Sequence, residues 1–191
     1  MIIYLHGFRS SPASEKALLL ARKMAERGLL DQFCCEQLPV SPQQAIKQIE
    51  GVIAGASTAP CLVGSSLGGF YATYLAEKHD LRAALINPAI VAHLSLAAYI
   101  GRQTNLYTGE TFEFTRTHIA ELAALEVSRL LKPERFWLLV ETGDEVLDYR
   151  QAVAKYAGSR QTILPGGDHS FRRFPEFIDA ILEFAGFQPE T

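Results

Sequence analysis

Residues 60–69 read PCLVGSSLGG, and this stretch decides the fold. Its first four residues form an apolar run typical of a buried strand, and an apolar helical pattern, Leu67–Lys78, follows directly. The G-x-S-x-G match at residues 64–68 is typical of a serine held on a strained turn from a strand into a helix. Glycines are needed there because side chains would clash with the neighbouring strand and helix. We therefore expect Ser66 at the carboxyl edge of a sheet, where open α/β sheets bind ligands.

Strand and helix patterns alternate along the rest of the chain. The apolar runs of strand length are Ile2–Leu5, Phe33–Leu38, Cys61–Val63, Ala83–Ile86, Phe136–Val140 and Thr162–Leu164. The helical patterns are Ala13–Arg27, Gln43–Ala54, Leu67–Lys78, Tyr149–Ala157 and Pro175–Phe184. Such alternation is typical of a parallel sheet covered on both faces. We expect a compact α/β fold of about six mostly parallel strands, formed as one domain by residues 1–191.

Two of the expected helices carry start and stop signals. Ser11-Pro12 precedes the first helix and Ser41-Pro42 the second, each a serine N-cap followed by proline at the first helical position. Gly28 and Gly55 mark their ends, because glycine commonly follows the last turn of a helix.

One segment, from about Ile90 to Lys132, breaks the alternation. It has no convincing strand pattern; it contains a helix-like piece, Leu94–Ile100, a polar loop around Gly109 and a second helical pattern, His118–Leu131. An insertion of this length between two core strands is a candidate helical cap over a site. Packing of these helices on the sheet is an equally open alternative.

A serine hydroxyl becomes a useful nucleophile only when a base takes its proton, so the motif requires a histidine at another strand end. Of the five histidines, only His169 lies in a glycine-flanked loop after the last expected strand. We therefore assign His169 as the base. Asp168 is assigned to the same loop without a catalytic role, because adjacent side chains point apart.

The orienting acid is expected after the strand Phe136–Val140. Asp144 directly follows Gly143 in the turn beyond that strand, and we assign it as the acid. Asp148 is the main alternative, although Asp148 and Glu145 could instead be solvated or cap the following helix. The chain order Ser66, Asp144, His169 is that of α/β-hydrolases.

Backbone amides are expected to form the oxyanion hole. One donor is the N–H of Leu67, which follows the serine, and the other is the N–H of Phe8, in the loop after the first strand. Gly7 permits close approach of that loop, and His6 is expected to be a structural hydrogen-bonding residue rather than a base.

Apolar residues of the 90–132 segment are candidates for a substrate pocket. Tyr99, Leu106 and Tyr107 could line an acyl site, although residues at such spacing are at least as often core. No cluster with metal-ligand spacing is present in the sequence, and the scheme needs no metal or cofactor.

The composition of the chain excludes several classes of protein. With 48% hydrophobic and 20% charged residues the chain is neither disordered nor a coiled coil, and a net charge of −3 argues against nucleic acid as a partner. The apolar stretch from Ala83 to Gly101 is interrupted by polar residues, so we expect no membrane span.

Two observations lead us to expect a cytoplasmic protein. The N-terminus lacks the pattern of a secretory signal. The three cysteines, Cys34, Cys35 and Cys61, form neither a disulfide framework nor a CxxC site, as expected of reduced thiols in a cytoplasmic protein.

The chain resembles the YqiA-type esterases, small bacterial members of the α/β-hydrolase superfamily. The matching stretches are LHGFRSSP at 5–12, GSSLGG at 64–69, INPA at 86–89, YTGE at 107–110, TGDEVLDYRQAVA at 142–154 and GGDHSF at 166–171. The resemblance implies a serine hydrolase that acts on acyl esters or acyl-CoA thioesters, with Ser66, Asp144 and His169 as its triad. Where the family often has Asn before the catalytic histidine, this chain has Asp168.

The expected partner is thus a small acyl ester or thioester. A non-catalytic ligand-binding protein on the hydrolase fold and an acyltransferase remain the alternatives, and the sequence says nothing about oligomeric state.

Overall fold

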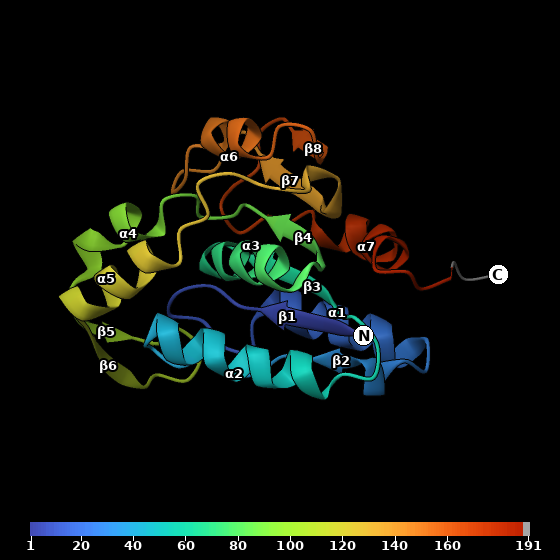
Figure 1. Ribbon diagram of the computed structural model, residues 1–191, viewed down its shortest axis with the longest axis horizontal. Helices are drawn as coiled ribbons and strands as arrows, with labels where there is room; N and C mark the ends of the chain where they lie inside the picture. Colours follow the sequence, from blue (N-terminus) through green and yellow to red (C-terminus); the bar gives the residue numbers. More distant parts are fainter. Residues whose placement is uncertain (189–191) are drawn as a thin grey trace.

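The computed structural model describes residues 1–188, whose elements alternate as expected (Figure 1). The main sheet contains β1 (Ile2–Leu5), β2 (Phe33–Cys34), β3 (Cys61–Ser65), β4 (Arg82–Ile86), β7 (Phe136–Glu141) and β8 (Arg160–Leu164). The α-helices are α1 (Glu15–Glu26), α2 (Pro42–Gly55), α3 (Leu67–His79), α4 (Ala92–Ser95), α5 (Arg116–Ala124), α6 (Tyr149–Lys155) and α7 (Ile178–Phe184). Short 3₁₀ helices lie at Leu30–Gln32, Ala97–Tyr99, Pro133–Arg135 and Phe174–Phe177.

Within residues 1–188 the main sheet has six strands in the order β2-β1-β3-β4-β7-β8, and every neighbouring pair is parallel. The expected parallel α/β fold is confirmed. Leu5 pairs with Gly64 and Ser65 pairs with Ile86, so the carboxyl ends of the central strands are level with one another. The loops that follow these strands therefore meet at one edge of the sheet.

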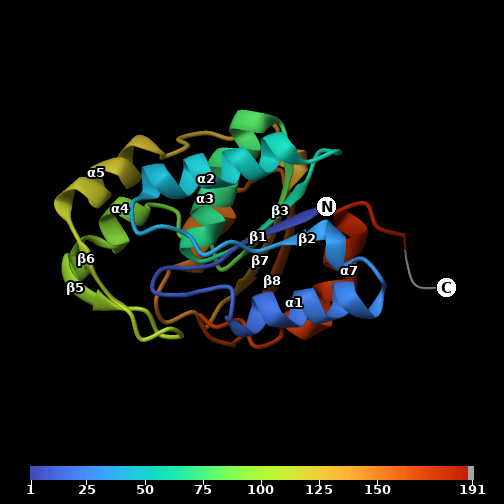
Figure 2. The ribbon, with the colours of Figure 1, turned by 90° about the horizontal axis from the view of Figure 1, so that it is seen from below.

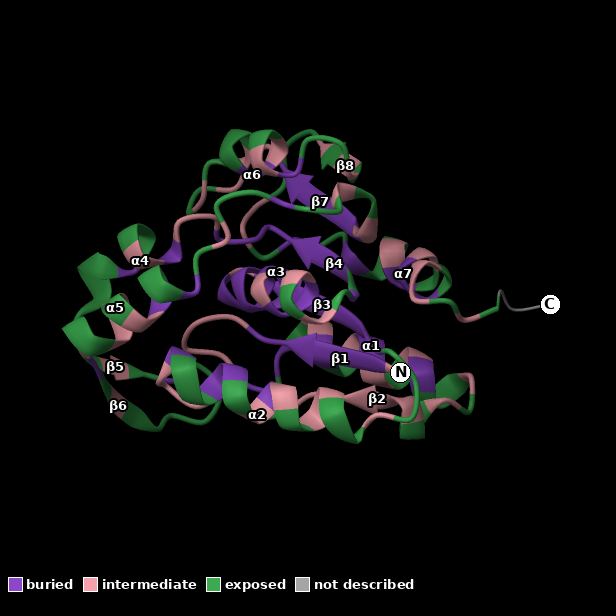
Figure 3. Ribbon diagram, viewed as in Figure 1, coloured by how far each residue is buried: buried purple, intermediate pink, exposed green. Residues whose placement is uncertain are grey.

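Alternate side chains of the strands enter two separate cores. Ile3, Leu62 and Leu85 pack with α2, α3 and α6 on one face. Ile2 and Val63 pack with α1 and α7 on the other, and Figure 2 shows these two helices together below the sheet. The central strands are consequently buried along nearly their whole length (Figure 3).

The expectation that residues 90–132 contain no strand is wrong. β5 (Gly101–Thr104) and β6 (Thr111–Phe114) form an antiparallel hairpin beyond the carboxyl ends of the main strands (Figure 1). Exposed residues alternate with partly buried ones and with the buried Phe114, so the hairpin lacks the continuous apolar run that marks a core strand. The helices of this segment are also shorter than expected: α4 has only one turn, and α5 ends at Ala124.

Two further boundaries differ from the sequence expectation. The first helix begins at Glu15 with Ser14 as its N-cap, because Ser11 instead forms a turn in which its hydroxyl accepts a hydrogen bond from the Ala13 amide. The edge strand β2 has only two residues rather than the six from Phe33 to Leu38. Ser41 caps α2 as expected and accepts a hydrogen bond from the Gln44 amide at 3.2 Å.

Candidate active site

Ser66 lies on the turn between β3 and α3, with a positive φ. Its φ of 55° and ψ of −120° fall in a region that side-chain-bearing residues avoid, at a cost of about 1–3 kcal/mol. The surrounding structure supplies the compensation: the Ser66 amide donates to the Ile86 carbonyl, and the Ser66 carbonyl accepts from the Gly69 and Ala89 amides, each at 3.0 Å. The serine side chain is thus held at the carboxyl edge of the sheet.

The glycines of the motif are explained by backbone packing. A Cβ on Gly64 would lie 2.3 Å from the Gly68 carbonyl oxygen, and a Cβ on Gly68 would lie 1.9 Å from the Leu5 carbonyl oxygen. Both distances are far below van der Waals contact with backbone atoms that cannot move aside. Strand β1, strand β3 and helix α3 can therefore meet this closely only with glycine at both positions.

The three side chains expected to act together form one hydrogen-bonded line. His169 Nε2 lies 3.0 Å from Ser66 Oγ, and His169 Nδ1 lies 2.8 Å from Asp144 Oδ2. Because a carboxylate only accepts, we assign the imidazole proton to Nδ1, which leaves Nε2 as acceptor for the serine hydroxyl.

Asp144 occupies the acid position of this line. Its side chain is 2% exposed and also accepts hydrogen bonds from the amides of Val146 and Leu147. Burial by itself raises the pKa of this carboxyl, but the hydrogen bonds from His169 and the two amides outweigh it, so the pKa of Asp144 lies below its ordinary value. The group is therefore an anion at neutral pH.

The alternative acids have other contacts. Asp148 caps α6, where its carboxylate accepts from the Arg150 amide at 3.0 Å and pairs with the Arg150 guanidinium at 2.8 Å. Glu145 Oε2 accepts a hydrogen bond from the main-chain amide of His169 at 3.0 Å, and so contacts the histidine through the backbone rather than the ring.

Two residues that the sequence analysis did not single out hold the histidine loop. Asn87, after β4, donates from Nδ2 to the carbonyls of Asp168 and His169 and accepts at Oδ1 from the Glu141 amide. Glu141, at the end of β7 and 1% exposed, accepts at Oε2 from the Asp168 amide at 2.9 Å. Their position in the sequence could have revealed them, because each directly follows an apolar strand run and so lies at the sheet edge that carries Ser66.

The two expected oxyanion donors lie beside the serine. In the part of the chain that the structure describes, the amides of Phe8 and Leu67 have no hydrogen-bond partner. A Cβ on Gly7 would lie 3.3 Å from Ser66 Cβ, which explains the small residue before Phe8. His6 is structural, as expected: Nδ1 donates to the Gly7 carbonyl at 3.0 Å and Nε2 accepts from the Leu38 amide at 3.1 Å.

A cavity of about 450 Å³ opens beside these amides. Gly7, Phe8 and Leu67 line it, together with Phe112 and Phe114 of the hairpin. The sequence analysis does not identify these two phenylalanines, because it does not predict the hairpin.

The residues expected to bind substrate do not line this cavity. Leu106 is 69% exposed and Tyr107 is 50% exposed, beyond the end of β5. Tyr99 packs edge-on against Phe8, with 5.6 Å between ring centroids, and so contacts the cavity wall from outside.

Comparison with protein families places the chain in a known group. The model of the uncharacterised protein family UPF0227 matches residues 1–186. The chain belongs to the UPF0227 family. A UPF0227 protein of Pectobacterium carotovorum is 30% identical over 104 residues, and one of Klebsiella pneumoniae is 28% identical over 104 residues. Each match covers 53% of this chain and only 58% of the relative's length.

Solved structures show the fold of this UPF0227 chain. Mouse alpha/beta hydrolase domain-containing protein 10 superposes with a TM-score of 0.73 at 16% identity, over 95% of this chain and 88% of the mouse chain. Est1E from Butyrivibrio proteoclasticus gives 0.66 at 16% identity, over 96% and 85%. Paleococcus ferrophilus monoacylglycerol lipase gives 0.67 at 16% identity, over 96% and 93%. The UPF0227 chain therefore has the α/β-hydrolase fold.

Among residues 1–188, no group of three or more His, Cys, Asp or Glu is arranged to hold a metal ion. Over the same residues, every helix is too short or too polar to cross a membrane. The three cysteines are unpaired, and burial raises the pKa of Cys35 and of Cys61 to about 12, so neither thiol is an activated nucleophile.

Proposed function

We propose that this chain is a serine hydrolase that cleaves acyl esters or acyl-CoA thioesters through a covalent acyl-enzyme. The observation that carries the proposal is the line of hydrogen bonds from Ser66 through His169 to Asp144, beside two amides that donate to no residue among 1–188. A nucleophile, its base, an orienting carboxylate and free N–H donors at one edge of a sheet are the parts that acyl transfer needs.

The first half of the reaction forms the acyl-enzyme. His169 Nε2 takes the proton of Ser66 as Oγ attacks the acyl carbonyl carbon, and Asp144 stabilises the resulting imidazolium. The Phe8 and Leu67 amides, together with the positive end of the α3 dipole, stabilise the oxyanion. His169 then donates its proton to the leaving alcohol or thiol as the carbon–oxygen or carbon–sulfur bond breaks.

The second half repeats these steps with water. His169 takes a proton from a water molecule, whose oxygen attacks the acyl carbon, and returns a proton to Ser66 Oγ as the acid leaves. No step needs a metal or a cofactor.

The 90–132 segment has a role in this proposal as a small cap that braces the oxyanion loop. Its hairpin is tied to the loop after β1 by hydrogen bonds from the Leu106 amide to the Arg9 carbonyl and from Asn105 Nδ2 to the Ser10 carbonyl, both at 2.8 Å. Arg9 Nε returns a bond to the Thr104 carbonyl at 3.0 Å. Three bonds between the two segments fix the position of Phe8, whose amide acts in the reaction.

Hydrolysis of para-nitrophenyl acetate and butyrate by wild type and Ser66→Ala tests the proposal. We expect turnover by wild type and its loss in a folded Ser66→Ala variant. Product analysis with added alcohols and thiols separates hydrolysis from acyl transfer, since a transferase would form the new ester or thioester faster than the free acid. Failure of the folded wild-type protein to cleave any ester would favour a ligand-binding protein instead.

A further inference from the structure

The cavity of about 450 Å³ lies on the acyl side of the proposed reaction. The leaving group must lie at His169, because His169 Nε2 gives it a proton. Among the described residues, the lining of the cavity includes both oxyanion donors, Phe8 and Leu67, and includes no residue of the loops that carry His169 and Asp144. The group left on Ser66 after the first step, rather than the departing one, is therefore the group that faces the cavity.

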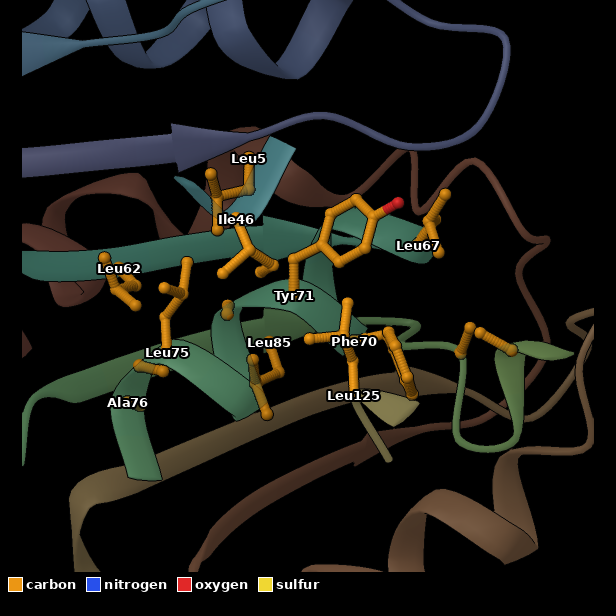
Figure 4. Close-up of a cluster of buried hydrophobic side chains, with 14 of the residues drawn as sticks. Leu5, Ile46, Leu62, Leu67, Phe70, Tyr71, Leu75, Ala76, Leu85 and Leu125 are labelled. Atoms are coloured by element: carbon orange, nitrogen blue, oxygen red, sulfur yellow. The ribbon is translucent and has the colours of Figure 1, made fainter. Parts of the chain in front are cut away.

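Tyr71 brings an unpaired hydroxyl to this cavity. It lies one helical turn after Leu67 on α3, lines the cavity and is 4% exposed. Figure 4 shows its hydroxyl pointing out of the apolar cluster, on the side of Leu67. Within residues 1–188 no protein group forms a hydrogen bond to this oxygen, and it is not one of the fully buried unpaired side-chain atoms, so it is open to the cavity. A molecule bound in the cavity can therefore form this hydrogen bond.

The hydroxyl is a donor at any ordinary pH. Burial, and secondarily the negative charge of Glu121, hold the pKa of Tyr71 well above its ordinary value. The neutral phenol can therefore donate its proton to an oxygen of a bound molecule.

The other residues that line the cavity suit an aromatic ring of a bound group. The Phe8 ring lies 5.9 Å from that of Phe112 and 4.9 Å from that of Phe114, both edge-on. All three line the cavity, as do polar residues such as Gln37 and Asn105. Aromatic edges and faces pack favourably on another ring. The cavity volume of about 450 Å³ falls within the usual range for ligand pockets, about 300–1,000 Å³, and accommodates one ring with a short linker.

We propose that this cavity is an acyl subsite for a short arylalkanoyl group bearing a ring oxygen, and that Tyr71 selects such a group by a hydrogen bond to that oxygen. The inference rests on the proposed serine-hydrolase function. It makes Tyr71 a specificity-determining residue, separate from the groups that carry out the chemistry.

The test compares para-nitrophenyl esters of phenylpropanoic acid and of its meta-hydroxyphenyl and para-hydroxyphenyl analogues. The measured quantity is the ratio of kcat/KM for each hydroxylated ester to that for the plain ester. In wild type we expect a ratio of about ten or more for at least one isomer, since a hydrogen bond to a desolvated group contributes about a factor of ten. In Tyr71→Phe that ratio should fall to about one.

Two tyrosines provide matched controls. Tyr74→Phe alters the same helix outside the cavity, where the ring instead lies under Lys78 Nζ, and should keep the wild-type ratio. Tyr156→Phe removes a hydroxyl that lies 2.6 Å from Thr73 Oγ1, so it should lower Tm by about 2–4 °C and also keep the ratio. Tyr71→Phe should not lower Tm, because its hydroxyl forms no hydrogen bond to any residue among 1–188.

Equal ratios in wild type and Tyr71→Phe would overturn the inference while leaving the proposed function standing, provided the plain ester is cleaved. If wild type cleaves none of the esters and Ser66 also gains no covalent adduct from a fluorophosphonate reagent, both the inference and the proposed function are overturned.

Discussion

Asn87 Nδ2 donates a hydrogen bond to the main-chain carbonyl of His169 at 3.2 Å, across 82 positions of sequence. The same amide nitrogen donates to the Asp168 carbonyl at 3.0 Å, and Asn87 Oδ1 accepts from the Glu141 amide. One side chain thus ties the end of β7, from which the acid loop starts, to the loop that carries His169. Asn87 has a φ of 39°, a left-handed conformation that asparagine tolerates better than most residues.

Asn87→Asp tests this link. A carboxylate keeps the acceptor for the Glu141 amide but replaces the donor with an oxygen that repels two carbonyls. We expect kcat to fall by about 10²-fold, because a misplacement of about 1 Å in a catalytic group has that effect. Steady-state kinetics together with Tm check the result. Unchanged kcat in a variant of wild-type Tm would show that Asn87 does not position His169.

The acid assignment is tested by Asp144→Asn beside Asp148→Asn. The first change keeps an oxygen for the Val146 and Leu147 amides but presents an NH₂ group to His169, which favours the wrong tautomer of the ring. We expect kcat to fall by roughly 10³–10⁴-fold. Asp148→Asn changes a helix cap and should leave kcat within about threefold of wild type, because asparagine also caps helices. The opposite order of effects would move the acid role to Asp148.

Sequence alone predicted the parallel sheet because its core strands are short apolar runs set between helical patterns. It also predicted the positions of Ser66, Asp144 and His169, since residues at the carboxyl ends of parallel strands meet at one edge. The hairpin β5–β6 escaped prediction because its strands are half exposed and carry Arg102, Thr104 and Glu113 outward.

The residues expected to line a substrate pocket differ from those that line the cavity for the same reason, namely that the sequence does not predict the hairpin. Tyr99, Leu106 and Tyr107 are apolar residues of the expected cap segment, whereas in the structure Phe112 and Phe114 of the hairpin line the cavity. Asn87 and Glu141 connect loops that are distant in sequence through side-chain hydrogen bonds, and a pattern of residue types does not reveal such bonds.

Gly68→Ala and Gly51→Ala form a matched pair for the turn that holds Ser66. A methyl group at Gly68 meets the Leu5 carbonyl oxygen, so unfolding free energy should fall by about 3 kcal/mol or more, with loss of activity. Gly51 lies within α2 with no atom near the added methyl, and alanine there should raise stability by about 0.5–1 kcal/mol. Urea denaturation measures both. A tolerated alanine at Gly68 would contradict the close contact of α3 with β1.

His6 makes stability depend on pH. Burial lowers the pKa of His6, outweighing the opposing hydrogen bond to the Gly7 carbonyl, and protonation at Nε2 would break the bond from the Leu38 amide. Because the folded pKa lies below the unfolded value of about 6.5, this contribution is present above about pH 6.5 and is lost as pH falls through the folded pKa.

His6→Gln removes that titration while keeping an acceptor. Between about pH 7.5 and pH 5.5 the Tm of wild type should therefore fall further than that of His6→Gln. Parallel Tm curves for the two proteins would show that His6 titrates alike in the folded and unfolded states.

The central claim is that Ser66 is an activated nucleophile, and labelling with a fluorophosphonate tests it without knowledge of the natural substrate. The reagent is added to wild type and to Ser66→Ala, and the adduct is mapped by mass spectrometry. We predict one adduct per wild-type chain at Ser66 and none in the variant. A folded wild-type protein that gains no adduct, or gains it at another residue, would contradict the account.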